Sequence, residues 1–262
     1  MATDAQALAG LAVAVTRPAR QNDRLLQSLR AQGADASAIP LLAIQPLQDP
    51  DAVQRIGQQL QALPDCHFAI FVSQNAAGET LAALQQRGMA WPDGLPAFTV
   101  GTATAAFLDS HGIRCSSPPV RMDSEGLLAL PAMLAVAGQR GVIFRGLGGR
   151  EALAQTLRAR GATVDYCELY RRCLPATAAA DWAQWLAGLA ARPALVCVNS
   201  RETLDNLLAV DKSAAARDNL TLLVPGDRVA QAARAAGFQR ICTAADATDS
   251  STLDTVLHWY RS

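Results

Sequence analysis

The chain has 262 residues, half of them apolar, so it can fill the core of one large domain or of two smaller ones. Its 23 basic and 23 acidic residues balance, so no overall field attracts nucleic acid or a lipid surface. Lys212, the only lysine, lies in a polar stretch, which argues against a Walker phosphate loop and a lysine-bound pyridoxal cofactor. The amino-terminal segment has no signal-peptide pattern and no apolar run is long enough to span a bilayer, so a cytoplasmic protein is expected.

Strands and helices alternate along the predicted chain. Leu11–Thr16 is a short apolar run of strand type, and an apolar helical spacing after it ends at Gly33. Five more strands, each followed by a helix-forming segment, are predicted at Phe68–Val72, Ala97–Val100, Val142–Phe144, Ala194–Val198 and Leu220–Val224. This alternation is typical of parallel, doubly wound sheets with right-handed crossovers.

Two apolar segments, Ala36–Leu47 and Ala162–Leu174, are longer than a strand of such a sheet needs. Pro40 and Pro46 exclude a helix in the first of them and favour an edge or linker strand. If the two segments pair, the chain passes between two domains twice, once along each segment. A plain division near residue 130 into two contiguous halves fits the pattern equally well.

The first half of the chain recurs in the second half. Arg17 and Gly33 return 128 positions later as Arg145 and Gly161, and two further blocks repeat in the same order, with Ser73 falling on Ser200 and Gly101 on Gly226. Such a repeat indicates a duplicated α/β module, so a cleft between two similar lobes is expected.

Candidate binding residues lie in the turns after the strands. In parallel α/β sheets a ligand binds beyond the carboxyl ends of the strands, where helix N-termini present backbone N–H groups. Small and polar residues that allow close approach or donate hydrogen bonds are Ser73, Asn75, Gly101, Thr102, Thr104, Gly146, Ser200 and Gly226. Arginines that could bind carboxylates in bidentate fashion are Arg17, Arg145, Arg150, Arg201 and Arg228. Helix capping is the structural alternative for Ser73 and Ser200.

Six motifs occur in a fixed order: TRP at Thr16–Pro18, FVSQNA around Ser73, VGTATA at Val100–Ala105, SEGLL at Ser124–Leu128, FRGLGGR at Phe144–Arg150 and ELYRR ending at Arg172. In this combination the chain resembles the uroporphyrinogen-III synthase family. The resemblance implies an α/β fold of two flavodoxin-like, doubly wound parallel-sheet domains joined by a two-stranded β linker. The first domain would hold residues 1–38 and 174–262, the second 42–168, and the linker strands 39–41 and 169–173. Asp227 and Arg228 depart from the small hydroxyl residues that the family usually has there.

The resemblance also implies an activity. The family cyclises the linear tetrapyrrole hydroxymethylbilane to uroporphyrinogen III, with inversion of ring D and loss of water, and uses neither a metal nor an organic cofactor. Tyr170 matches the tyrosine of the linker motif and would donate a proton to the leaving oxygen, although an anchoring role stays open. A monomer is expected, with no nucleic-acid or membrane partner, and a transient contact with the upstream hydroxymethylbilane synthase is compatible with this. The alternative function is a two-lobed binding or regulatory module that holds a small anionic metabolite without transforming it.

Overall fold

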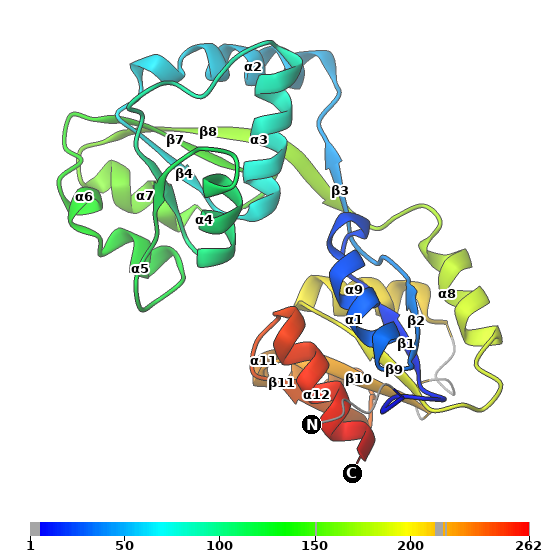
Figure 1. The fold of residues 1–262 in the computed structure, drawn as a ribbon. Helices are drawn as coiled ribbons and strands as arrows, with labels where there is room; N and C mark the ends of the chain where they lie inside the picture. Colours follow the sequence, from blue (N-terminus) through cyan, green and yellow to red (C-terminus); the bar gives the residue numbers. More distant parts are fainter. Residues whose placement is uncertain (1–5, 150, 213–216, 218, 262) are drawn as a thin grey trace. The chain divides into compact units, whose positions relative to one another are not determined.

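The computed structural model describes residues 6–149, 151–212, 217 and 219–261. The chain divides into two compact units, unit 1 with Met1–Ala43 and Cys173–Ser262, and unit 2 with Ile44–Arg172. Each unit is built around its own β-sheet with helices packed on it (Figure 1). Because unit 1 takes its residues from both ends of the chain, the plain division near residue 130 is excluded.

Unit 1 holds a five-stranded sheet in the order β11-β10-β9-β1-β2. Its parallel strands are β1 (Ala12–Val15), β2 (Asp35–Ala38), β9 (Ala194–Cys197), β10 (Leu220–Pro225) and β11 (Arg240–Ala244). The strand β1 is apolar throughout because helices cover both faces of the sheet. Val13 and Val15 pack with α1 (Asp23–Ala31) and α12 (Asp249–Arg261). The short 3-10 helix η1 (Ala19–Gln21) lies between β1 and α1 in the chain. Ala12 and Ala14 pack with α8 (Ala178–Ala187), α9 (Arg201–Val210) and α11 (Asp227–Ala235).

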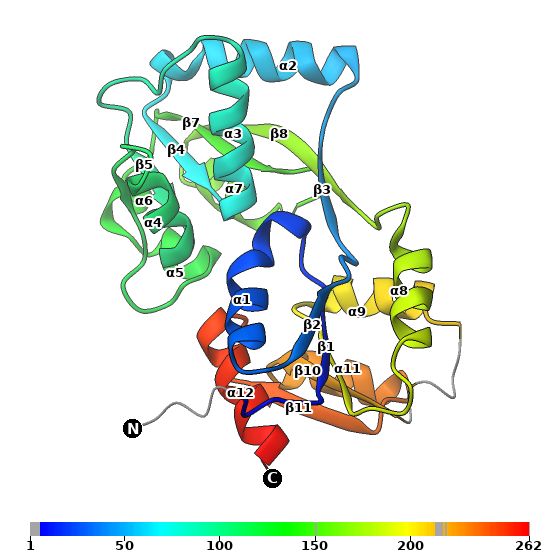
Figure 2. The same ribbon diagram turned by 45° about the vertical axis from the view of Figure 1, so that its right-hand side comes forward.

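Unit 2 holds a six-stranded sheet in the order β3-β8-β7-β4-β5-β6. The strands are β3 (Ala43–Pro46), β4 (Phe68–Phe71), β5 (Ala97–Thr99), β6 (Cys115–Ser116), β7 (Arg140–Gly146) and β8 (Thr163–Cys173). One face carries α2 (Pro50–Gln61), the 3-10 helix η2 (Leu63–Asp65), α3 (Gln74–Gln86) and α4 (Thr102–Asp109) (Figure 2). The other face carries α5 (Ser124–Leu128), α6 (Pro131–Leu134) and α7 (Ala152–Ala159).

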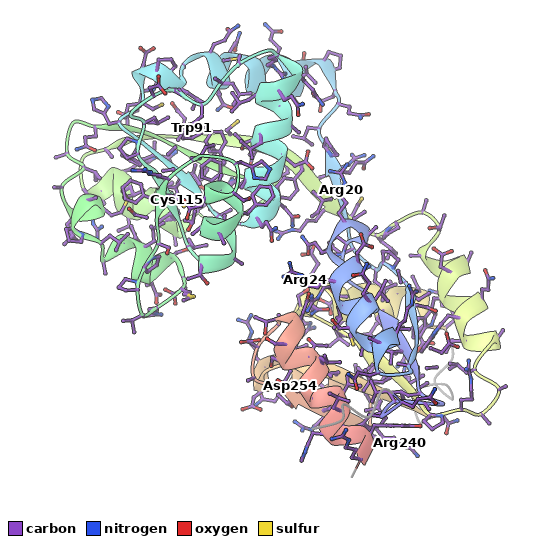
Figure 3. All side chains as sticks on the ribbon, in the orientation of Figure 1. Arg20, Arg24, Trp91, Cys115, Arg240 and Asp254 are labelled. Carbon is purple, nitrogen blue, oxygen red and sulfur yellow. The ribbon has the colours of Figure 1, made fainter. Side chains whose placement is uncertain are left out.

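An aromatic cluster lies in the core of unit 2 beneath α3. The rings of Phe71 on β4 and Phe144 on β7 stack with centroids 4.8 Å apart, and Trp91 lies 5.5 Å from Phe71. Figure 3 shows Trp91 among the side chains of this unit. The cluster fixes β4 against β7, the two strands whose ends carry Ser73 and Gly146.

The two sheets are equivalent under a permutation of the chain. Read from β2, unit 1 has the order β2-β1-β9-β10-β11, and unit 2 has β8-β7-β4-β5-β6 with β3 added at the edge. The repeat seen in the sequence maps β1 onto β7, β9 onto β4 and β10 onto β5, which are equivalent places in the two sheets. Residues with equivalent positions in the repeat therefore follow equivalent strands.

The structure places the first linker strand later than the sequence resemblance implies. Residues 39–41 belong to no strand, although Ile39 N–H donates to the Val15 carbonyl at 3.0 Å. Pro40 has no N–H for a ladder, and the strand begins beyond it, as β3. β3 neighbours β8 in the sheet of unit 2, so the pairing that the sequence left open is present. β8 is one continuous strand that contains 169–173. No helix in the described part of the chain is long and apolar enough to cross a membrane.

Candidate functional site

A cavity of about 260 Å³ opens at the carboxyl ends of β4, β7 and β8 in unit 2. Its wall includes Ser73, Arg145, Gly146, Gly149, Tyr166, Tyr170 and Arg172. The place agrees with the rule that parallel α/β sheets bind ligands beyond the carboxyl ends of their strands. Four of the predicted site residues, Ser73, Arg145, Gly146 and Tyr170, therefore meet at one cavity.

A pair of hydroxyl groups lies in the wall of this cavity. Ser73 is the N-cap of α3 and accepts a hydrogen bond from the Ala76 N–H at 3.1 Å. Its oxygen also lies 3.1 Å from the Tyr170 hydroxyl, and either group can be the donor. When Ser73 donates, the phenolic proton of Tyr170 is left for a bound acceptor. Tyr170 is only 3% exposed, so its ring is held by packing.

Gly146 makes room for the ring of Tyr170. A Cβ atom at this position would lie 2.6 Å from Cε2 and 2.8 Å from Cζ of Tyr170, closer than packed carbon atoms allow. The close approach follows from a register shift between β7 and β8, where Arg145 pairs with Glu168 and Gly146 with Tyr170. The extra residue in β8, Leu169, is a bulge, and bulges turn side chains toward a site at a strand end.

Arg145 is surrounded by groups of the chain itself. Its side chain is 8% exposed, and Nε and Nη2 donate to Glu168 Oε1 at 3.0 and 2.8 Å. Nη2 also lies 2.9 Å from Glu151 Oε1, and Nη1 donates to the Gly149 carbonyl at 3.2 Å. The guanidinium carbon lies 3.5 Å from the centroid of the Tyr166 ring, a cation–π contact. The expected bidentate fork for a substrate carboxylate is thus occupied.

The charges of this cluster shift one another's pKa values. Burial acts to lower the pKa of Arg145, but hydrogen bonds with Glu151 and Glu168 outweigh it and hold that pKa above its ordinary value. The hydrogen bond from Arg145 lowers the pKa of Glu151. Burial, followed by the contact with Glu151, raises the pKa of Tyr166. The guanidinium and the Glu151 carboxylate therefore stay charged near neutral pH.

Four other predicted residues of unit 2, those that begin α3 and α4, lie at the same sheet edge and outside the cavity wall. Asn75 is in the first turn of α3 and is half-buried. Gly101 is the N-cap of α4, Thr102 is exposed and Thr104 is buried. Arg150 lies outside the described residues.

Unit 1 carries its predicted residues at the carboxyl edge of its own sheet. Arg17 follows β1, is buried, forms an ion pair with Asp249 and donates to the Ala247 carbonyl at 2.7 Å. Ser200 is the N-cap of α9 and accepts from the Thr203 N–H at 3.1 Å. Its side chain therefore has the capping role that the sequence left open.

The remaining residues of unit 1 begin two helices. Arg201, in the first turn of α9, is exposed and pairs with Asp205 at 2.8 Å. Gly226 caps α11 with φ of +82°, a left-handed conformation that favours glycine. Arg228 is exposed in the first turn of α11. The structure thus leaves these residues at one sheet edge of unit 1 and the cavity residues at one sheet edge of unit 2.

Sequence reasoning missed five residues at the cavity or its charge cluster: Ser124, Glu151, Tyr166, Glu168 and Arg172. Tyr166, Glu168, Tyr170 and Arg172 all stand at every second position of β8. A two-residue period was the available signal for Tyr166 and Glu168, but the bulge at Leu169 interrupts it before Tyr170, so the spacing was no guide to Arg172. Ser124 lies in the SEGLL motif, and Glu151 had no distinguishing pattern.

Comparisons with known proteins agree on one family. The family model described as "Uroporphyrinogen-III synthase HemD" matches residues 23–254. The uroporphyrinogen-III synthase of Escherichia coli K12 is 34% identical over 93% of this chain and 98% of its own length. That of Salmonella typhimurium is 33% identical with the same coverage of both chains.

Solved structures support the same fold at low sequence identity. A mutant uroporphyrinogen III synthase of Thermus thermophilus superposes with a TM-score of 0.63 at 16% identity, covering 96% of this chain and 98% of that one. The Helicobacter pylori enzyme gives 0.60 at 13% identity, covering 94% and 98%. At such identities these matches establish the fold alone. The family model and the bacterial relatives establish the family. The chain belongs to the uroporphyrinogen-III synthase family of cyclising lyases in tetrapyrrole biosynthesis.

Proposed function

We propose that this chain closes hydroxymethylbilane to uroporphyrinogen III, with inversion of ring D and loss of water, and that the cavity of unit 2 holds the reacting end of the substrate. The observation that carries the placement is the Ser73–Tyr170 hydroxyl pair in the cavity wall, against the open backbone of Gly146. A volume of about 260 Å³ suits one pyrrole ring with its acid side chains, and not a whole tetrapyrrole.

The bond-breaking step needs little from the protein. The leaving hydroxyl is attached to a carbon on an electron-rich pyrrole, so the ring's electrons push out the C–O bond pair. Tyr170 donates its proton to the departing oxygen, which leaves as water, while Ser73 stabilises the phenolate by donating a hydrogen bond to it. The phenolate recovers a proton from the terminal pyrrole, which loses one from its free α-carbon when the macrocycle closes. The cation left on the substrate carbon is attacked by the terminal ring.

The choice of isomer depends on orientation. Attack by the substituted α-carbon of ring D gives a spiro intermediate. The bond from that carbon to its original bridging carbon then breaks, and the bridging carbon bonds to the free α-carbon of ring D, which loses its proton, so the ring ends inverted. Direct attack by the free position gives the unrearranged isomer instead. A rigid wall formed by the Tyr170 ring and the β7–β8 strand ends restricts which atom reaches the cation. This restriction is the larger part of the proposed catalysis.

The substrate's eight carboxylates need donors. In unit 2 the proposed partners are Arg172 and the N–H groups at the start of α3. In unit 1 they are the helix starts that carry Ser200, Arg201, Gly226 and Arg228. Asn75, Gly101, Thr102 and Thr104, at the sheet edge of unit 2, remain proposed contributors, and so does Arg150.

A coupled assay tests the activity. Purified protein receives hydroxymethylbilane freshly made by hydroxymethylbilane synthase, and the oxidised porphyrin isomers are separated by chromatography. Type III product is expected. If only the spontaneous type I isomer forms while the protein retains the ligand, the binding or regulatory module replaces the proposed enzyme.

We also propose that the protein acts as a monomer in the cytoplasm and meets the upstream synthase only transiently. Light scattering after size exclusion tests the monomer, with a dimer mass as the contrary result. Cell fractionation tests the location. A stable complex with the upstream synthase on the same column would contradict a transient contact.

A further inference from the structure

We propose that Arg145 and its repeat-related counterpart Arg17 are positioning residues that hold the strand-end loops, and that neither binds the substrate. For Arg145 this rests on the function proposed above, because the loop in question forms part of the cavity wall. Both residues would otherwise be natural choices for carboxylate recognition in a protein whose substrate is a polyanion.

The guanidinium of Arg145 has a chain partner on each side. Glu168 on β8 takes Nε and Nη2, Glu151 takes Nη2 and the Gly149 carbonyl takes Nη1. The Tyr166 ring covers one face at 3.5 Å. A substrate carboxylate could bind here only by displacing a carboxylate already in place, so it would gain little over the existing contacts.

These contacts join three pieces of chain. Glu168 belongs to β8, Gly149 to the turn after β7, and Glu151 is the N-cap residue of α7. The turn folds back over Arg145 so closely that a Cβ atom on Gly149 would lie 3.2 Å from Arg145 Cδ. Since Gly146 and Gly149 both line the cavity, the guanidinium sets where that wall stands.

Arg17 has the equivalent place in unit 1 and partners of similar chemistry, although its carboxylate comes from α12, which is not the counterpart of α7. It follows β1, the counterpart of β7, and is also buried. Its partners are the carboxylate of Asp249, at the first residue of α12, and the Ala247 carbonyl. The Asn199 amide oxygen, in the orientation that satisfies both groups, accepts from Nε at 2.8 Å. In each unit a strand-end arginine ties a turn and an acidic residue at a helix start to the sheet.

The two roles predict different kinetics. A substrate fork, when lost, weakens binding, and KM rises by the worth of a charge-assisted hydrogen bond, on the order of tenfold or more. A positioning residue acts through the loop, so kcat and the type III fraction fall while KM changes little. Removing the Glu151 carboxylate separates the two roles most clearly. If Arg145 binds substrate, its guanidinium becomes more available and binding tightens. If Arg145 positions the loop after β7, that loop loses a contact and kcat falls.

The experiment compares Arg145→Lys, Glu151→Ala and the double variant with the wild-type enzyme in the coupled assay. Arg140→Lys is the matched control, because Arg140 pairs with Asp165 between the same two strands, β7 and β8, but is exposed. We expect each single variant to lower kcat about tenfold and to lower the type III fraction, with KM within about twofold. The double variant should have the same kcat as Arg145→Lys, because both substitutions remove the same interaction between Arg145 and Glu151. Amide hydrogen exchange at Gly146–Gly149 should accelerate in these variants and stay unchanged in the control.

Three results would overturn the proposal for Arg145: a tenfold rise in KM with an unchanged type III fraction, tighter substrate binding in Glu151→Ala, or no kinetic change in either variant. Glu151 is half-exposed, so its variant remains informative if Arg145→Lys fails to fold. A wild-type enzyme that yields only type I product contradicts the proposed function. The hydrogen-exchange comparison would still test whether Arg145 and Glu151 hold the loop after β7.

For Arg17 the variants are Arg17→Lys and Asp249→Asn. Exchange should accelerate at the amino end of α12, with KM unchanged within about twofold. A tenfold rise in KM with native exchange in α12 would instead make Arg17 a substrate contact.

Discussion

At the scale of single residues, Tyr170 combines a ring fixed by packing with a hydroxyl that meets Ser73 at the cavity. Tyr170→Phe keeps the ring against Gly146 and removes only the hydroxyl. We expect kcat to fall on the order of 10²-fold, the lower end for a lost general acid, while the free energy of unfolding falls by about 1 kcal/mol, the worth of one hydrogen bond. Isomer-resolved kinetics and thermal unfolding measure the two effects. Unchanged turnover would leave Tyr170 as an anchor only.

Gly146 gives a steric prediction at the same site. Gly146→Ala places a methyl group 2.6 Å from Tyr170 Cε2, so the ring must move. Overpacking of this kind costs about 1–3 kcal/mol of stability, and we expect activity to fall by at least tenfold as the hydroxyl leaves Ser73. Gly57→Ala in α2 is the control, because its methyl group would meet Arg87 Nε at an ordinary 3.5 Å. Equal activities of the two variants would contradict the role of Gly146.

The sequence carried part of this site. Ser73, Gly146 and Tyr170 lie in short motifs at predicted strand ends, so their convergence could be expected from the topology. The sequence could not predict that carboxylates of the chain itself bind the Arg145 guanidinium, because this depends on the register of β7 against β8 and on the bulge beside Glu168. No local pattern specifies that register, and an arginine with carboxylate partners 6 and 23 positions away looks in sequence like an open fork.

At the scale of elements, Ser73 and Ser200 begin equivalent helices with the same capping bond. Ser200→Ala removes the acceptor for the Thr203 N–H and should lower the free energy of unfolding by about 1 kcal/mol. Ser73→Ala should cost a similar amount of stability and also lower kcat, because only Ser73 meets a tyrosine hydroxyl. Denaturant unfolding and steady-state kinetics on both variants check the contrast. A larger loss of kcat in Ser200→Ala would show that unit 1 acts in the chemistry.

Most strands were predictable because central strands of a covered parallel sheet are short, fully apolar runs. β4 and β9 have every residue buried. Edge elements carried a weaker signal: β11 buries only Ala244 fully, and β6 has two residues. β3 begins later than implied because Pro40 removes a ladder donor, an effect that the resemblance alone did not resolve.

At the scale of the whole molecule, the permuted equivalence of the two sheets explains how one repeat builds both units. Unit 1 takes β1 and β2 from the start of the chain and β9–β11 from its end, whereas unit 2 is contiguous. The sequence repeat is therefore offset from the boundaries of the folded units. Spacing alone could not choose between a discontinuous unit and two simple halves, because the repeat is the same in both.

This arrangement predicts which fragments fold. Residues 44–172 contain β4–β8 with both apolar layers of unit 2, so this fragment should unfold cooperatively on its own. Residues 1–130 and 131–262 should not, because that cut separates β4 from its partner β7 and β1 from its partner β9. Circular dichroism and thermal melts of the three fragments measure the difference. Cooperative unfolding of the 1–130 fragment would contradict it, since that fragment keeps β4–β6 but loses the two strands, β7 and β8, that complete the cavity and cover one side of β4.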